Sequence, residues 1–493
     1  MFNEECIPFA PALVESMRSL GYSFESAIAD LIDNSVSALA DRIEIIAKPG
    51  DDPSMIIFDD GCGMTKKELY EAMRYGSQNP LVQRSENDLG RFGLGMKAAS
   101  LSQCRSLVVV SKKDGEIWGY SWDMDFIVEE QSWMLKGYAE SELKEYPYID
   151  MFDEVEHGTY IYLTKFDRIK ESSNDVSNTF NRHIYETSNH LALVFHRFID
   201  DGLNIYVNKI KLKARDPFLR TNRATQQKRE SSFYINDEKI TLKPFILPHM
   251  SKLKQDDLDK IGGKDKLRNE QGFYVYRNKR LIIWGTWFRL ERKDELSKLA
   301  RVMVDIPNSL DNMWSIDIKK SKAVLPDIIK QNMFNAVYEA VASSENVHQY
   351  RGRRKKKKEE VEYVWERILR KDRDGYKYEI NRKIPQIELL ASTLEKEQLV
   401  LLDKLISTIE ESFPVSALYV DVAKGKVEEN KVQEKNNEEV EELWDELQEQ
   451  IDYVKQTNGD VEHYYRLFMK TEPYCNFEII GKRICEEIGE NEG

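Results

Sequence analysis

The stretch A-I-A-D-L-I-D-N-S, Ala27–Ser35, decides the fold expected for this chain. With Phe24 before it, its residues follow the i, i+3, i+4 spacing of a helix with one buried face. Asp30 and Asn34 project about one turn from each other. An amide oxygen is a hard ligand suited to Mg²⁺, and a carboxylate one turn away can accept a proton from an attacking water. The alternative is that Asp30, Asp33 and Asn34 form the solvated face of an amphipathic helix.

A second motif, F-D-D-G-C-G-M, covers Phe58–Met64. It follows an apolar run typical of a strand. An acidic residue at the end of a buried strand, followed by two glycines, can reach a ligand that lies against bare backbone. We therefore expect Asp59 to accept a hydrogen bond from the exocyclic amine of adenine. The alternative, an ordinary Asp-Gly turn, accounts for one glycine and not for the second.

A third motif, L-G-R-F-G-L-G-M-K, covers Leu89–Lys97 and leads into a stretch expected to open a helix. Glycines before a helix N-terminus leave free backbone N–H groups and a favourable dipole for phosphate. The spacing G-x-x-G-x-G is neither the Walker pattern nor the Rossmann pattern, so this motif alone carries little weight. The three motifs together, in this order, predict a pocket for ATP and its magnesium ion.

On these motifs the chain resembles the GHKL superfamily of ATPases, which includes gyrase, MutL, the large heat-shock chaperones, the histidine kinases and the MORC proteins. The stretch H-G-T-Y-I-Y-L, His157–Leu163, is similar to the family's G-T-x-I-x-L strand. The resemblance implies an N-terminal two-layer α/β sandwich, the Bergerat fold, with ATP between a helical layer and a lid. It implies that Asn34 binds magnesium and that Asp30 stands where the family usually has a general-base Glu.

The resemblance also implies the nucleotide contacts and the lid. Adenine contacts are implied for Asp59, Gly61, Gly63, Met64 and Thr159. The phosphates would be wrapped by Gly90, Gly93 and Gly95, with Lys97 nearby. The stretch Thr65–Leu89 corresponds to the lid over ATP.

Asp30 departs from the family pattern, because Asp is one methylene shorter than Glu. A carboxylate displaced by roughly 1 Å can lose on the order of a hundredfold in rate. We expect slow hydrolysis rather than none.

Downstream, Leu203–Leu212 and Ser232–Leu242 alternate as half-buried strands do, and Gly272–Ile282 reads as a hairpin. This region resembles the transducer domain of gyrase, MutL and MORC proteins, and it argues against a histidine kinase. Such domains carry a lysine that reaches the γ-phosphate, for which Lys320 is the candidate and Lys319 the neighbouring one. The alternative is a pair of surface lysines.

The expected fold class is α+β, with an ATP-binding domain at 1–200, a transducer-like domain at 201–345 and a charged, mostly helical region at 346–493. Helix-like periodicity occurs in Val361–Leu369 and Ile387–Phe413. The basic run Arg351–Lys358 is either a solvated linker or a phosphate contact. The acidic stretch Glu428–Asp452 is either a flexible linker or a solvated helix.

Composition predicts a cytoplasmic protein. The net charge is −14 and hydrophobic residues make up 41% of the chain. No apolar run approaches the ~20 residues that span a bilayer, so no membrane partner is expected. Five cysteines without a C-x-x-C pair fit reduced thiols. His183, His190 and His196 are assigned to packing or the surface, and no zinc site is expected.

The functional hypothesis is a Mg-ATP-driven switch that homodimerises on ATP binding and drives a protein partner. The motifs look most like MORC proteins and their prokaryotic relatives, which are often associated with restriction or phage defence. By analogy this suggests a DNA-linked role beside a nuclease partner. The alternatives are a chaperone-like ATPase acting on proteins and a non-hydrolysing ATP-binding regulatory module.

Overall fold

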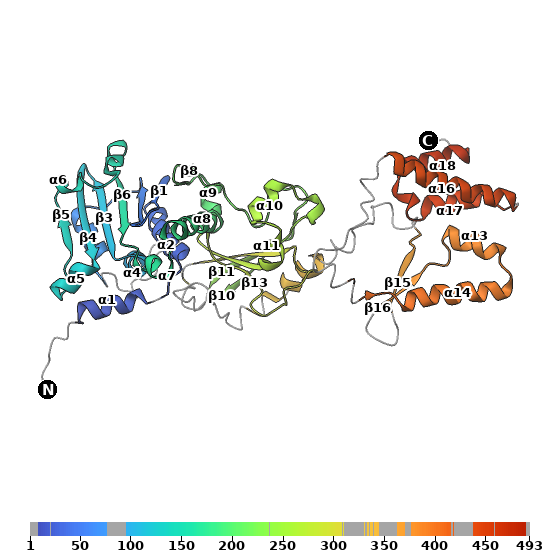
Figure 1. Ribbon diagram of the computed structural model, residues 1–493, viewed down its shortest axis with the longest axis horizontal. Coiled ribbons are helices and arrows are strands. Elements are labelled where there is room, and N and C mark those ends of the chain that lie inside the picture. The colour runs from blue at the N-terminus through green and yellow to red at the C-terminus, as the bar shows by residue number, and fades with distance from the viewer. Residues whose placement is uncertain are drawn as a thin grey trace, which may run out of the picture. The chain divides into compact units, whose positions relative to one another are not determined.

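The computed structural model has two compact units, Met1–Gln349 and Tyr350–Gly493 (Figure 1). In the first unit it describes residues 8–19, 21–75, 95–235, 237–307, 309, 330, 333, 334, 336–338 and 340–344. In the second unit it describes residues 362–369, 376–415, 418, 437–457 and 459–489.

The first unit opens with an eight-stranded sheet in the order β5-β4-β3-β6-β2-β1-β7-β8 among its described residues. Its strands are β1 (Arg42–Lys48), β2 (Ser54–Asp59), β3 (Ser106–Lys113), β4 (Glu116–Asp123), β5 (Lys136–Tyr138), β6 (Gly158–Thr164), β7 (Asn204–Val207) and β8 (Ile210–Lys211). The pair β1–β7 is parallel, and the other neighbouring strands are antiparallel. The central strand β2 is buried on both faces.

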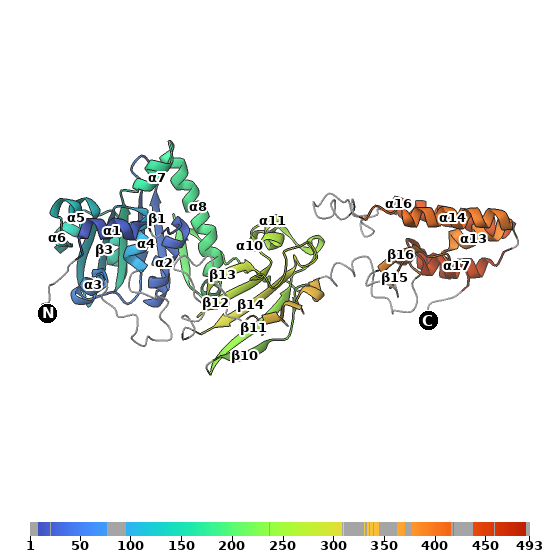
Figure 2. The same ribbon diagram turned by 90° about the horizontal axis from the view of Figure 1, so that it is seen from below.

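A layer of helices covers one face of this sheet (Figure 2). Its main members are α1 (Ala10–Arg18), α2 (Phe24–Ser37), α4 (Gly95–Gln103), α7 (Asp167–Ser172) and α8 (Val176–Val194). The apolar face predicted for α2 is buried between the other helices and the sheet. Smaller elements complete the domain: α3 (Lys66–Met73), α5 (Met124–Glu130), α6 (Glu140–Leu143), the 3₁₀ helix η1 (Ile149–Glu154) and α9 (His196–Asp200). The expected two-layer α/β sandwich is confirmed.

A second sheet follows in the same unit, in the order β10-β11-β14-β12-β13, with β9 pairing β11. Its strands are β9 (Gln226–Gln227), β10 (Ser231–Ile235), β11 (Glu238–Ile246), β12 (Gly272–Arg277), β13 (Arg280–Thr286) and β14 (Ala300–Ile306). The helices η2 (Met250–Lys252), α10 (Gln255–Ile261) and α11 (Lys264–Asn269) lie between β11 and β12 in the chain. The predicted hairpin at Gly272–Ile282 is the β12–β13 pair.

Two predicted strands of this region differ from the structure. Leu203–Leu212 forms the hairpin β7–β8, and it joins the first sheet because β7 pairs with β1. Its turn residues, Asn208 and Lys209, have φ values of 47° and 68°, which suit a tight hairpin turn. Ser232–Leu242 is also a hairpin, β10–β11, rather than one strand. Alternation continues through a two-residue turn, so the pattern alone does not reveal the reversal.

A buried ion pair joins helix α2, which covers the first sheet, to strand β13 of the second sheet. Arg280, at the start of β13, donates from Nε to Oδ1 of Asp33 on α2 at 2.7 Å, and the side chains are 3% and 6% exposed. The same guanidinium lies over the ring of Phe195, 4.4 Å from its centroid. Nearby, the buried His196 ring and the Tyr276 hydroxyl are 2.7 Å apart. Asp33 is therefore a structural anchor and not part of a solvated stripe.

The second unit is mainly helical. Its helices are α13 (Pro385–Thr393), α14 (Lys396–Glu411), α16 (Asn437–Gln456), α17 (Val461–Lys470), η4 (Tyr474–Asn476) and α18 (Glu478–Glu487). The acidic stretch that reaches Asp452 contains the larger part of α16, whose apolar face is buried against α17 and α18. Within Val361–Leu369 the helix prediction is wrong, because β15 (Trp365–Leu369) pairs with β16 (Tyr376–Ile380). Among the described helices, none has both the length and the apolarity to cross a bilayer.

We predict that Arg280→Met lowers the free energy of unfolding of the first unit by about 3–5 kcal/mol, because it leaves the buried Asp33 carboxylate without this cation. Removing both charges in Asp33→Asn/Arg280→Met is expected to recover much of that loss. Denaturant unfolding of the full chain measures both effects. The exposed pair Glu140–Lys144 supplies the control, since Lys144→Met should change stability by less than about 1 kcal/mol. A double variant no more stable than Arg280→Met would contradict a specific pairing.

Candidate functional site

Helix α2 presents the first predicted pair toward solvent. Ser23 caps the helix by accepting a hydrogen bond from the Ser26 backbone N–H. Asn34 is exposed and Asp30 half-buried on this helix. An exposed amide oxygen fits a magnesium ion that takes its other ligands from phosphates and water. Asn34 is thus a suitable single protein ligand.

Tyr22, which precedes α2, is a neighbour of Asp30 that the sequence analysis missed. Burial, the Asp30 charge and a side-chain hydrogen bond with Asp30 raise the pKa of the Tyr22 hydroxyl. The hydroxyl therefore stays protonated and can donate to the Asp30 carboxylate. Such a bond limits the rotamers of Asp30. An aromatic residue eight positions before a carboxylate has no local signal that would predict this contact.

Asp59 ends β2 in a buried polar cluster. Its Oδ2 accepts from the Ser35 hydroxyl at 2.7 Å, and its Oδ1 accepts from the Gly61 N–H at 3.0 Å. Burial raises the pKa of Asp59 to about 6, although the hydrogen bonds from Ser35, Gly61 and the Thr159 backbone favour the ionised form. A carboxylate has about four lone-pair sites, so Asp59 keeps acceptor capacity for a further donor.

The loop after Asp59 is shaped by its glycines. A Cβ on Gly61 would lie 2.8 Å from the Ala38 Cβ, and one on Gly63 would lie 2.1 Å from the Lys112 carbonyl oxygen. Gly63 also has φ of +61°, in the left-handed region. The glycines are therefore required by packing against the protein itself. This reason differs from the expected one, which was the approach of a ligand to bare backbone.

Met64 and Thr159 lie beside this loop. The Met64 N–H donates to the Ser111 hydroxyl at 2.8 Å, and Ser111 Oγ lies 3.4 Å from Thr159 Oγ1. Thr159 stands opposite Asp59 in the β2–β6 register. Ser35 and Ser111 complete the cluster and were missed as site residues. The sequence feature that could have identified these two residues is a serine within an otherwise apolar helix face or strand.

The third motif is only partly described. Gly90 and Gly93 lie outside the described residues, as does most of the predicted lid, and Gly95 begins α4. Lys97 is buried, and its Nζ donates to the Ala72 carbonyl at 2.7 Å. Burial lowers the pKa of Lys97 to about 8. This hydrogen bond from Lys97 links α4 to α3.

Lys319 and Lys320 also lie outside the described residues. Of the predicted site residues, the structure brings together Asp59, Gly61, Met64 and Thr159 around the loop that follows β2. Asn34 and Ser35 are consecutive on α2, so the exposed amide adjoins the residue that holds Asp59.

Comparisons with known proteins point to one superfamily. Residues 22–159 match a family model described as histidine kinase-, DNA gyrase B-, and HSP90-like ATPase. That span begins at Tyr22 and ends at Thr159, so it contains Asp30, Asn34 and Asp59.

Three curated relatives match short segments. ATPase morc-1 of Caenorhabditis elegans is 33% identical over 93 residues, which are 19% of this chain and 10% of that protein. DNA mismatch repair protein MutL of Rickettsia akari (strain Hartford) is 32% identical over 91 residues, 18% of this chain and 15% of that protein. ATPase MORC2B of Mus musculus is 32% identical over 92 residues, 18% of this chain and 9% of that protein.

Among solved structures, the N-terminal domain of a DNA repair protein is similar over 64% of this chain and 93% of that chain. The sequence identity is 17% and the TM-score 0.39. The curated relatives are longer proteins, and this chain spans only a small share of their length. Residues 22–159, which contain the cluster around Asp59, thus match the GHKL ATPase superfamily, and the chain is similar to MORC and MutL proteins over short segments.

Proposed function

We propose that the chain is a Mg-ATP-binding and hydrolysing switch that homodimerises on ATP binding and drives a partner. One observation carries this proposal: the Asp59 carboxylate is buried, held by Ser35 and Gly61, and keeps acceptor capacity beside the exposed Asn34. Such an acceptor suits the exocyclic amine of adenine. Guanine presents a carbonyl oxygen at the corresponding position and would be rejected.

The residues of α2 have separate roles in this proposal. Asn34 would hold magnesium, which when bound neutralises charge on the phosphate oxygens. Asp30 would accept the proton of the attacking water, and Tyr22 would keep its carboxylate oriented. The glycines Gly90, Gly93 and Gly95 are proposed to surround the phosphates.

The proposed switching is supported by the ion pair of Asp33, the residue that precedes Asn34 on α2. Asp33 is paired with Arg280 of the β12–β13 hairpin, so a shift of α2 on nucleotide binding would reach the second sheet directly. Lys320, or its neighbour Lys319, is proposed to sense the γ-phosphate from that domain. Dimer formation is a further part of the same proposal.

The partner is proposed to be DNA-linked, of the restriction or phage-defence type. Similarity to MORC proteins and to the mismatch repair protein MutL supports this part. A specific observation favours a second candidate, a non-hydrolysing ATP-binding module, because Asp30 is shorter than the usual Glu. Phosphate release measured with and without duplex DNA tests both whether ATP is hydrolysed and whether DNA stimulates the hydrolysis.

We expect Asn34→Ala to abolish Mg-ATP binding and ATP-dependent dimerisation, because it removes the only proposed protein ligand of the ion. Titration calorimetry and sedimentation with a non-hydrolysable analogue measure the two effects. Asn189→Ala, on α8, is the matched control and should behave as the wild type. A variant at Asn34 that still dimerises with ATP at wild-type strength would sink the proposal.

We expect ATP affinity to fall as the pH drops through about 6, because the pKa of Asp59 is raised to about 6 and its protonated form is a poorer acceptor. Below that pH the loss should approach tenfold per unit. Asp59→Asn should bind at least about tenfold more weakly at pH 7.5. Phosphate protonation affects both proteins alike, so the ratio of their affinities isolates Asp59. An unchanging ratio between pH 7.5 and 5.5 would count against adenine recognition by this carboxylate.

We expect Asp30→Ala to lower phosphate release by about a hundredfold or more, the usual worth of a general base. Asp30→Glu should raise turnover if the short side chain limits it, and Tyr22→Phe should lower kcat with little change in KM. Steady-state phosphate release measures all three. Background rates in the wild type and in both Asp30 variants would instead favour the non-hydrolysing module.

A further inference from the structure

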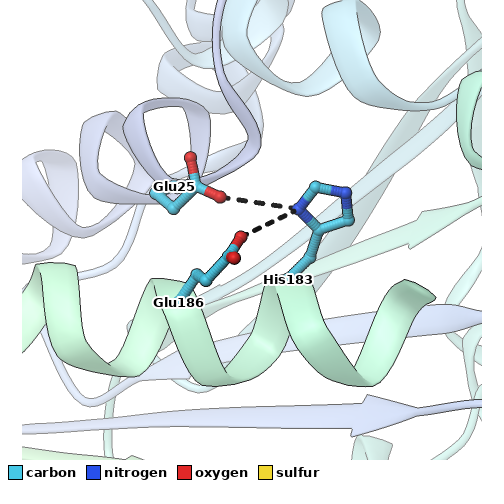
Figure 3. A group of neighbouring side chains, drawn as sticks. All are labelled: Glu25, His183 and Glu186. Atoms are coloured by element: carbon cyan, nitrogen blue, oxygen red, sulfur yellow. Dashed lines mark hydrogen bonds and ion pairs between the residues drawn. The ribbon is translucent and has the colours of Figure 1, made fainter. Parts of the chain in front are cut away.

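Two acidic side chains and one histidine converge between helices α2 and α8 (Figure 3). Glu25 comes from the first turn of α2, and His183 and Glu186 come from α8. His183 Nδ1 lies 3.5 Å from Glu25 Oε1 and 3.8 Å from Glu186 Oε2. The potential ligand atoms of all three residues lie within 4.8 Å of one another.

The contact of His183 with Glu25 is at the outer limit of a hydrogen bond and the contact with Glu186 lies beyond that limit, so both separations suit a shared metal ion better. A charge-assisted hydrogen bond between nitrogen and carboxylate would measure about 2.7–2.9 Å. Nitrogen and oxygen ligands of tetrahedral zinc lie about 2.0–2.2 Å from the ion, so two such ligands lie roughly 3.4 Å from each other. The distances from Nδ1 to the two carboxylates are therefore close to the edges of a metal coordination tetrahedron.

The charge balance also favours a cation at this point. Both carboxylates approach the same ring nitrogen, and one N–H group can donate to only one of them at full strength (Figure 3). In the part of the chain that the structure describes, no Lys or Arg forms an ion pair with Glu25 or Glu186. One partly buried carboxylate and one exposed carboxylate against one imidazole leave a net negative charge that a divalent ion would neutralise.

The histidine ring is held in a fixed orientation. It stacks on the buried Phe24 ring with centroids 4.9 Å apart and planes at 25°. Phe24 adjoins Glu25 on α2, so the same helix turn supplies the stacking surface and a ligand. Preorganisation of this kind lowers the entropy lost when a metal binds.

We propose that Glu25, His183 and Glu186 form a site for a zinc-class divalent transition ion. Three protein ligands leave a fourth position open to water. The imidazole ligand favours such an ion over magnesium, which prefers oxygen ligands alone. The bound ion fastens the first turn of α2 to α8, five residues before Asp30. This site is independent of the proposed ATPase function.

No zinc site is expected from the sequence, because the two halves of this one are 158 residues apart. His183 and Glu186 alone are an i, i+3 pair, which is common on helix surfaces. Only the packing of α2 against α8 brings in Glu25.

The test uses the full-length chain, stripped of metal with a chelator and kept free of nucleotide. Zn²⁺ binding is measured by equilibrium dialysis with metal analysis, in parallel for the wild type and Glu186→Gln. The wild type should bind about one more equivalent than the variant, or bind it at least tenfold more tightly. Both proteins carry the same cysteines, so thiolate binding cancels in the comparison. Glu171→Gln, an exposed change on α7, should match the wild type.

A second readout is thermal unfolding of the metal-free proteins with added Zn²⁺. Zinc should raise the unfolding temperature of the wild type and of Glu171→Gln, but not of Glu25→Gln or His183→Gln. Because Glu186 is half-exposed, its variant should fold, and circular dichroism checks this. Equal zinc binding by the wild type and Glu186→Gln would overturn the proposal and leave the three residues as a simple ion-pair cluster.

Discussion

The buried pairing of Asp33 with Arg280 is the interaction on which the arrangement of the first unit depends. Two charges removed from water lose their hydration, so neither can separate from the other without a large cost. Since one lies on α2 and the other on the β12–β13 hairpin, the helix and the hairpin have to hold one relative position. Apolar packing alone would allow sliding, because it is not directional.

Three consecutive residues of α2 then make three different connections. Successive side chains of a helix are rotated by about 100°, so they leave in different directions. Asp33 binds Arg280, Asn34 faces solvent, and Ser35 donates to Asp59. A displacement of this one turn is felt at the second sheet, at the proposed magnesium position and at the proposed adenine contact together. This geometry would provide a physical route for coupling the proposed nucleotide binding to the second sheet.

Local patterns could predict the helix α2, the end of β2 and the helix–strand layers, because period and turn chemistry are properties of neighbouring residues. They could not predict the partner of Asp33, since Arg280 follows 247 residues later. For the same reason the local pattern could not place β7 in the first sheet, because its partner β1 lies far away in the sequence. Sequence distance does not explain the error at β15, whose partner β16 follows it closely, so there the helix-like period itself was misleading. The glycines were expected for the right loop but for a different reason, since Ala38 and Lys112 are the neighbours that exclude a side chain.

In the candidate site, too, local sequence predicts some features, and distant residues determine the others. Asp59 stands out in the sequence, but its state depends on Ser35 and Thr159, which approach from α2 and β6. Burial raises its pKa to about 6 even with these donors present, which indicates that the ionised carboxylate is incompletely stabilised in the folded chain. A donor placed on its remaining lone pairs would favour the ionised form and gain more free energy than the same contact at an exposed carboxylate. Burial with spare acceptor capacity therefore distinguishes this turn from an ordinary Asp-Gly turn and supports the proposed contact with an amine donor.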